Sequence, residues 1–222
     1  MTARTMRRGG LGLGAVLVVV AAIVLSLGAG QAKALTPWLY IDTSPGTGAP
    51  PPTLGGYGMI PFPPDPQPTG TDVTSVAVPP TPLGALGPQG SILFDQPMDH
   101  VTIGSGWATW SNGYTGDVYT SLDAPDINHV VITLPAKTAA FYLYVEPDIF
   151  STFAVTATGK SAFGWSTSTT LLVNGLGGAR YIGVYSVSGG FVKTIRIDVD
   201  PAADGFAVGE FGINGGKIVK AT

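Results

Sequence analysis

The chain has 222 residues, of which 32 are glycine, 19 are proline and none is cysteine, and only 11% are charged. This length allows one ordinary domain with appended segments, and a composition rich in Gly, Pro, Thr, Ser and Val excludes a helical bundle or coiled coil. The absence of cysteine excludes disulfides, thiolate catalysis and cysteine-ligated zinc or iron–sulfur sites. We therefore expect an all-β protein that is held together by packing alone.

The N-terminal residues 1–34 have the pattern of an export signal. Three arginines precede an apolar run over residues 11–27, and the small side chains of Ala32 and Ala34 suit cleavage after Ala34. The alternative is an uncleaved membrane anchor, because the 19 residues 11–29 could span a bilayer. In both cases we expect the remainder to be secreted or otherwise extracytoplasmic.

The charge of the remaining chain argues against binding to polyanions. Without residues 1–34, seven basic residues stand against 14 acidic ones, and no Lys or Arg occurs between Lys33 and Lys137. Phosphate groups and anionic lipids need cationic partners. We therefore expect no nucleic acid and, after signal cleavage, no membrane as a partner; a glycan or a protein at the cell surface remains.

Residues 35–90 form a segment of their own by composition, because they hold 14 of the 19 prolines. Proline fixes φ and removes a backbone donor, so we expect an extended, polyproline-like arm or linker rather than regular structure. The aromatic residues within it leave two interpretations open, a recognition arm or a spacer that lies on its own domain.

From Ser91 the pattern changes to short apolar runs of period two, separated by Gly, Asn and Asp. We predict an antiparallel, jelly-roll-like β-sandwich over residues 91–216 and a short tail over 217–222. Asn-Gly pairs, which tolerate positive φ, predict turns at 112–113, 174–175 and 214–215. The expected strands are Ser91–Asp95, His100–Ile103, Trp107–Trp110, Asp117–Ser121, His129–Leu134, Ala139–Glu146, Thr152–Thr158, Ser168–Val173, Ala179–Ser186, Phe191–Val199 and Phe206–Ile213.

Alternation along the strands assigns side chains to faces. Phe141, Leu143 and Val145 fall on one side of their strand and are expected in the core, whereas Tyr142 and Tyr144 fall on the other side.

The glycine-rich stretch 104–119 is the strongest candidate binding site. Aromatic rings stack on the apolar faces of sugars, while amide and carboxylate groups bond to the hydroxyls. We therefore predict a glycan site with Trp110 directed outward and Trp107 directed into the core; the alternative is that the aromatic residues are packing. The predicted ligand-binding residues are Trp110, Asn112, Tyr114, Asp117 and Tyr119.

A second cluster of carboxylates, Asp198, Asp200 and Asp204, lies in a loop between two expected strands. Calcium prefers several oxygen ligands from such a loop. The spacing does not fit an EF-hand, so solvated turn residues are the alternative. Calcium is the only cofactor for which the sequence offers a candidate.

Catalytic signatures are weak. The two histidines, His100 and His129, lie in no recognisable catalytic frame. The composition does not exclude glycoside hydrolysis by two carboxylates, and the candidates are Glu146, Asp148 and Glu210.

Several stretches of the predicted sandwich are similar to a group of secreted bacterial β-sandwich proteins, many of which carry a C-terminal Pro-Glu-Pro sorting tail. The resemblance covers roughly residues 91–213 and implies a jelly-roll-like extracellular domain without an established activity. This chain departs from the pattern, because residues 215–222 contain no Pro-Glu-Pro motif and no membrane span. The stretches that carry the resemblance are 106–110, 113–119, 140–147, 178–185 and 205–213.

Three classes of function follow from these observations. A non-catalytic binding or adhesion module comes first, because the chain combines an export signal, a sandwich and an aromatic stretch of low charge. A structural or matrix protein of the bacterial cell envelope comes second, and a glycan-acting enzyme third.

Overall fold

The computed structural model describes residues 39–187 and 189–217; the predicted signal segment and tail residues 218–222 lie outside this range. The predicted all-β class is confirmed, since the described regular structure is β-strand apart from two 3-10 turns, η1 (Gly84–Leu86) and η2 (Pro201–Ala203). Within the described residues, no helix has the length and apolar character needed to cross a membrane. The strands are β1 (Leu39–Asp42), β2 (Thr53–Leu54), β3 (Tyr57–Pro61), β4 (Thr71–Ala77), β5 (Ser91–Ile103), β6 (Gly106–Trp107), β7 (Asp117–Thr120), β8 (His129–Thr133), β9 (Ala140–Pro147), β10 (Thr152–Ser161), β11 (Ser166–Asn174), β12 (Arg180–Ser186), β13 (Val192–Val199) and β14 (Phe206–Lys217).

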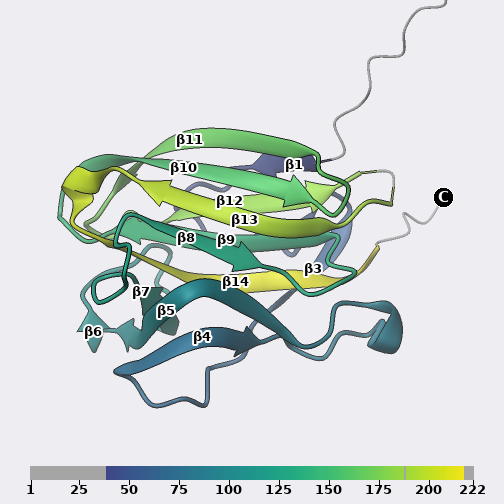
Figure 1. Cartoon of the computed structure of the whole chain (residues 1–222), viewed down its shortest axis with the longest axis horizontal. Coiled ribbons are helices and arrows are strands. Elements are labelled where there is room, and N and C mark those ends of the chain that lie inside the picture. The colour runs from purple at the N-terminus through teal and green to yellow at the C-terminus, as the bar shows by residue number, and fades with distance from the viewer. Residues whose placement is uncertain (1–38, 188, 218–222) are drawn as a thin grey trace, which may run out of the picture. The chain divides into compact units, whose positions relative to one another are not determined.

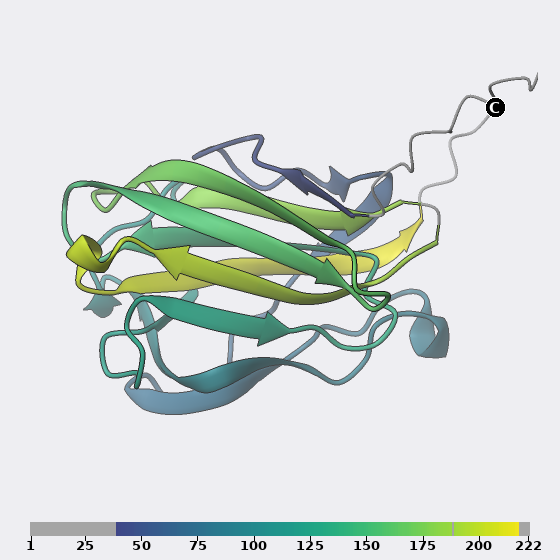
Figure 2. The same cartoon turned by 45° about the horizontal axis from the view of Figure 1, so that its top comes forward.

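The strands form an antiparallel sandwich. Hydrogen bonds connect them in the order β1-β12-β9-β14-β7-β5-β8-β13-β10-β11, and only the short β6 pairs in parallel, with β5. The path folds back on itself, so that β1 and β12 contact β10 across the interior, and β9 contacts β11 and β13. Figures 1 and 2 show β10, β11 and β13 stacked over β9 and β12.

Strand β5 links the two layers. Its first part pairs with β8 at Leu93 and Phe94, and its second part pairs with β7 around His100. The two expected strands 91–95 and 100–103 are therefore one strand. Pro97 is tolerated inside it because the pairing with β4 shifts register at this point and demands no N–H from that residue.

The segment 35–90 differs from the expected arm. Strand β1 pairs with β12, β3 pairs with β14, and β4 pairs with β5, so these strands extend the same sheet as the rest of the domain. The predicted boundary at residue 91 is wrong, because the prolines lie between the strands and at their ends and leave short runs free to pair. The described residues accordingly belong to one compact unit.

The added strands explain why both faces of β9 are buried. Phe141, Leu143 and Val145 belong to the core between the two layers, as predicted. Tyr142 and Tyr144 point to the opposite side, also as predicted, but they belong to a second core. Residues from β2, β3 and the glycine-rich stretch, including Leu54, Tyr57, Trp107 and Trp110, cover that side.

The predicted Asn-Gly turns have two outcomes. Asn112 and Gly113 both adopt positive φ, 49° and 78°, as a tight turn requires. Asn214 and Gly215 instead lie inside β14, beside a register shift, and the Asn214 side chain accepts a hydrogen bond from the Ala139 N–H at 2.8 Å. The turn predicted at 214–215 is therefore wrong. Asn214 lies at a buried strand position, where its side chain satisfies backbone donors.

Candidate functional site

The candidate site forms where β14 changes its partner. Residues Ala207–Gly209 pair with β7, whereas the strand from Gly212 onward pairs with β3. The pairing with β9 shifts register between Gly209 and Gly212, and Glu210 within this bulge has a φ of 50°. Positive φ is costly for a residue with a side chain, and such strain is concentrated at functional sites.

The Glu210 carboxylate is buried and held by two donors. The indole N–H of Trp110 donates to Oε2 at 3.0 Å, and the Asn112 side-chain amide donates to the same oxygen at 3.1 Å. Burial raises the pKa of Glu210, and the hydrogen bonds from Asn112 and Trp110 partly oppose that shift. The strained bulge thus presents a carboxylate whose orientation is fixed.

A pocket of about 230 Å³ opens beside Glu210. Its walls combine aromatic rings with two carboxylates, and its lining contains no Lys or Arg. The lining residues are Phe62, Pro63, Pro64, Tyr114, Gly116, Asp117, Tyr119, Glu210 and Phe211.

The Asp117 carboxylate is the centre of a hydrogen-bonded network at the pocket wall. Its Oδ1 lies 2.9 Å from His100 Nε2, and its Oδ2 accepts from the backbone N–H of Asp65 at 2.8 Å. The Asp65 carboxylate in turn accepts from the Tyr119 hydroxyl at 2.8 Å. The second ring nitrogen of His100 lies 3.3 Å from the Pro68 carbonyl oxygen, so the network attaches the proline-rich loop 62–69 to β5 and β7.

The tyrosine hydroxyls of the pocket remain protonated. Burial raises the pKa of Tyr114, and the negative charges of Asp117 and Glu210 raise it further. The pKa of Tyr119 is also raised, chiefly by burial and then by its hydrogen bond to Asp65. Both side chains therefore act as neutral rings with a hydroxyl donor.

The structure brings the five predicted binding residues together in two roles. Tyr114, Asp117 and Tyr119 line the pocket, and Trp110 and Asn112 hold Glu210 behind it. The outward orientation expected for Trp110 is wrong: this side chain is only 8% exposed, because its N–H reaches inward to a buried carboxylate.

Sequence reasoning missed three contributors to this site. Phe62 and Asp65 belong to the segment expected to be an arm, and His100 begins an expected strand and lies in no recognisable catalytic frame. A signal was present for Asp65, since it is the single acid in the proline cluster 61–68. Its partners in the network, Asp117 and Tyr119, are 52 and 54 residues away along the chain, so local patterns do not reveal them.

A second buried carboxylate, Glu146 on β9, anchors the other tryptophan. Trp107 is buried as predicted, and its indole N–H donates to Glu146 Oε2 at 2.9 Å. The backbone N–H of Gly178 donates to Oε1 at 2.9 Å, and the Thr109 hydroxyl lies 3.3 Å from the same oxygen. Burial raises the pKa of Glu146 to about 6 in spite of these bonds.

The predicted calcium ligands do not converge. Asp198 is paired with Arg196 at 2.6 Å, and Asp200 caps η2 by accepting from the Ala202 N–H at 2.9 Å. Asp204 ends that turn with a φ of 55°. Among the described residues no group of three or more His, Cys, Asp or Glu side chains could hold a metal ion. Local bonds within the loop thus engage Asp198 and Asp200 separately.

Comparisons with known proteins add little. No protein-family model and no curated protein matches the chain. One solved structure to which it is similar is the enzymatically active domain of tailspike protein 4 from bacteriophage CBA120, with 12% identity and a TM-score of 0.32. The similarity covers 55% of this chain and 19% of the tailspike chain. Values this low establish neither a family nor a function.

Proposed function

We propose that the protein is a secreted, non-catalytic β-sandwich module that binds a neutral glycan in the pocket beside Glu210. The observation that carries the proposal is the composition of this pocket, which joins the partly exposed rings of Phe62 and Tyr114 to the carboxylates of Asp117 and Glu210 without a cation. Rings of this kind stack on sugars, and carboxylates accept hydrogen bonds from hydroxyl groups.

The acceptors of the pocket are held in place before any ligand arrives. Both oxygens of Asp117 and one oxygen of Glu210 already accept hydrogen bonds from the protein. A site whose side chains are ordered in advance loses less conformational entropy on binding. Its volume of about 230 Å³ is below the range of roughly 300–1,000 Å³ for drug-sized ligands, so it suits a single sugar ring at a chain end.

A glycan array with the chain from Leu35 onward, which follows the predicted cleavage site, tests the proposal, followed by calorimetry with any glycan retained. Tyr114→Leu removes the stacking ring and keeps an apolar side chain, so we expect binding to weaken by about 0.5–1.5 kcal/mol. Tyr40→Leu is the matched control, because Tyr40 lies on β1 and stacks on Tyr185 outside the pocket. Absence of binding to any glycan would favour the structural envelope protein instead.

Cleavage of a glycan is the second candidate, and one observation favours it: Asp117 and Glu210 line the same pocket. Glycosidases use two carboxyl groups, one of them protonated, and burial raises the pKa of Glu210 in the required direction. Incubation with the bound glycan separates the two functions. A binding module releases no reducing ends, whereas an enzyme releases them and loses this activity in Glu210→Gln while it still binds.

A further inference from the structure

Acidic residues are unevenly distributed between the loops at the two ends of the sandwich. At one end, the loops 78–90, 134–139, 161–165 and 187–191 contain no Asp or Glu. Loops at the opposite end carry five aspartates, Asp123, Asp126, Asp148, Asp200 and Asp204. We call the first group of loops, with the strand residues Lys160 and Lys193 beside them, the basic end.

Hydrogen bonds join the four loops of the basic end into one surface. The ammonium group of Lys137 donates to the Ala85 carbonyl at 2.6 Å, which links loop 134–139 to η1. Backbone bonds connect Leu134 with Lys193 at 2.9 Å and Ala162 with Phe191 at 3.1 Å. Because the loops are bonded to one another, their side chains form a common surface.

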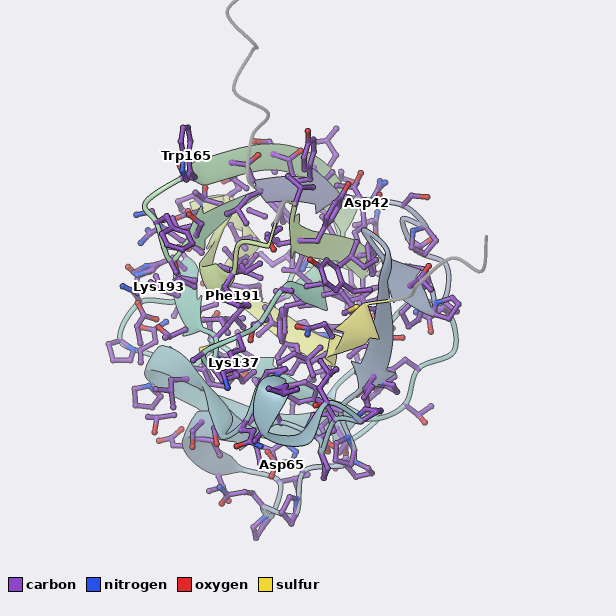
Figure 3. All side chains as sticks on the ribbon, turned by 90° about the vertical axis from the view of Figure 1, so that its right-hand side faces the viewer. Asp42, Asp65, Lys137, Trp165, Phe191 and Lys193 are labelled. Atoms are coloured by element: carbon purple, nitrogen blue, oxygen red, sulfur yellow. The ribbon has the colours of Figure 1, made fainter. Side chains whose placement is uncertain are left out.

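This surface combines exposed lysines with exposed aromatic rings. Lys137, Lys160 and Lys193 are exposed and form no ion pair with a described residue. Phe163 and Trp165 are 64% and 41% exposed. Figure 3 looks onto this end and shows Trp165, Phe191, Lys193 and Lys137 along one side of it.

An apolar hollow lies between two of the lysines. It has a volume of about 380 Å³ and is lined by residues of β8, β13 and the loops, with Lys137 and Lys193 among them. Phe191 forms part of its wall and is 36% exposed. The hollow offers an apolar group a place beside two cations.

The first described strand, β1, also begins at the basic end. Leu39, the first described residue, pairs with Ser186, the last residue of β12. The Ser186 N–H donates to the Ala139 carbonyl at 2.8 Å, which places this pair beside loop 134–139.

We propose that the basic end docks on the surface of a membrane that contains anionic phospholipid. Lysines attract anionic headgroups, and aromatic side chains insert at the level of the headgroups and acyl chains. The aspartates of the opposite end are repelled by the same surface, so the domain binds in one orientation.

The low overall content of basic residues argued against a membrane as a partner, but composition does not reveal that the exposed lysines share one end. None of the residues that line the glycan pocket belongs to the four loops, so the two proposals are independent.

Sedimentation with lipid vesicles tests the docking surface. The protein from Leu35 onward should pellet with vesicles of phosphatidylcholine and phosphatidylglycerol, far less with phosphatidylcholine alone, and less as salt is added. Lys137→Gln with Lys193→Gln should weaken binding by about 25-fold, since each lysine near the surface contributes about fivefold, or about 1 kcal/mol. Phe191→Ser should weaken it as well, whereas Phe150→Ser, at the opposite end and 59% exposed, is the matched control and should not.

Fluorescence locates the contact. In a Trp38→Phe background, which removes a tryptophan outside the described residues, Trp165 is the exposed fluorophore, because Trp107 and Trp110 are buried. Phosphatidylglycerol brominated in the acyl chains should quench Trp165. The proposal is overturned by a lack of binding to anionic vesicles, by an equal effect of Phe150→Ser, or by self-association through this end without binding to vesicles.

Discussion

Trp107 and Trp110 are the residues on which the glycine-rich stretch depends. Each indole N–H donates to a buried carboxylate on a central strand, Glu146 on β9 for Trp107 and Glu210 on β14 for Trp110. The rings fill the second core, and their hydrogen bonds satisfy groups that would otherwise be costly to bury. The two tryptophan side chains thus attach the stretch to the sheet and are themselves buried.

Replacement of either tryptophan by alanine should lower the free energy of unfolding by about 3–5 kcal/mol, because each change empties a large aromatic site. Trp110→Phe should cost less, about 1–3 kcal/mol, since it mainly removes the donor to Glu210. Urea unfolding followed by circular dichroism measures both. Unchanged stability in Trp110→Ala would show that this ring faces solvent.

Glu146 should make stability depend on pH. Burial raises its pKa from 4.5 to about 6, so between these values the folded protein binds a proton more tightly than the unfolded chain. The contribution of Glu146 to the free energy of unfolding should therefore be fully present below pH 4.5, and about 2 kcal/mol of it should be lost as the pH rises through 6.

Glu146→Gln provides the comparison for this prediction. The amide cannot titrate, so unfolding in urea at a series of pH values should give a flatter profile for the variant. A smaller slope should remain from Glu210, whose pKa burial also raises. Identical profiles for the variant and the natural protein would contradict the assignment.

Among the elements, β1 to β4 complete the domain. β2 and β3 form a hairpin around Gly55 and Gly56, both with positive φ, and Gly55 lies so close to the Tyr185 ring that a Cβ atom would clash with it. β3 then pairs with the second half of β14 and leads directly into Phe62 at the pocket. These short strands cover the second core and build one wall of the candidate site.

A chain that starts at Ser91 should therefore fail to fold cooperatively, although it contains the entire sandwich that the strand pattern predicts. Its loss of β1 to β4 exposes Tyr142 and Tyr144 and leaves β14 and β5 with unpaired edges. Near-ultraviolet circular dichroism during urea unfolding compares it with the chain from Leu35. An equal unfolding midpoint for the two chains would restore the boundary at residue 91.

At the scale of the whole molecule, most strand pairs join segments that are distant in sequence. β1 pairs with β12, β3 with β14 and β7 with β14, so the ends of the described chain meet within one sheet. The chain between two such strands must close into a long loop before the strands can pair, and this closure costs conformational entropy.

We therefore expect the protein to refold slowly for a single domain, within milliseconds to seconds. Stopped-flow fluorescence of Trp107 and Trp110 measures this rate. A deletion of β2 and β3 should slow or abolish the phase in which these tryptophans become buried, because Leu54 and Tyr57 of these strands complete their core. Refolding within microseconds would indicate that local contacts dominate instead.

The sequence by itself determined the class of fold, the approximate positions of the strands beyond residue 91, and the separation of Phe141 from Tyr142 on opposite faces of β9. These features depend on local alternation, turn residues and composition, which a single segment carries. The sequence also indicated Tyr114, Asp117 and Tyr119 as one site, because they lie close together along the chain.

The tertiary structure decided which faces are buried and which residues meet. Period-two alternation distinguishes two faces but does not tell whether a second layer covers the outer one, so the burial of Tyr144 and Trp110 depended on strands from the proline-rich segment. The meeting of Glu210 with Trp110, and of Asp117 with Asp65, joins residues 100 and 52 positions apart. Such contacts arise from strand pairing across the whole chain, because long-range register is set by the packing of all the layers together.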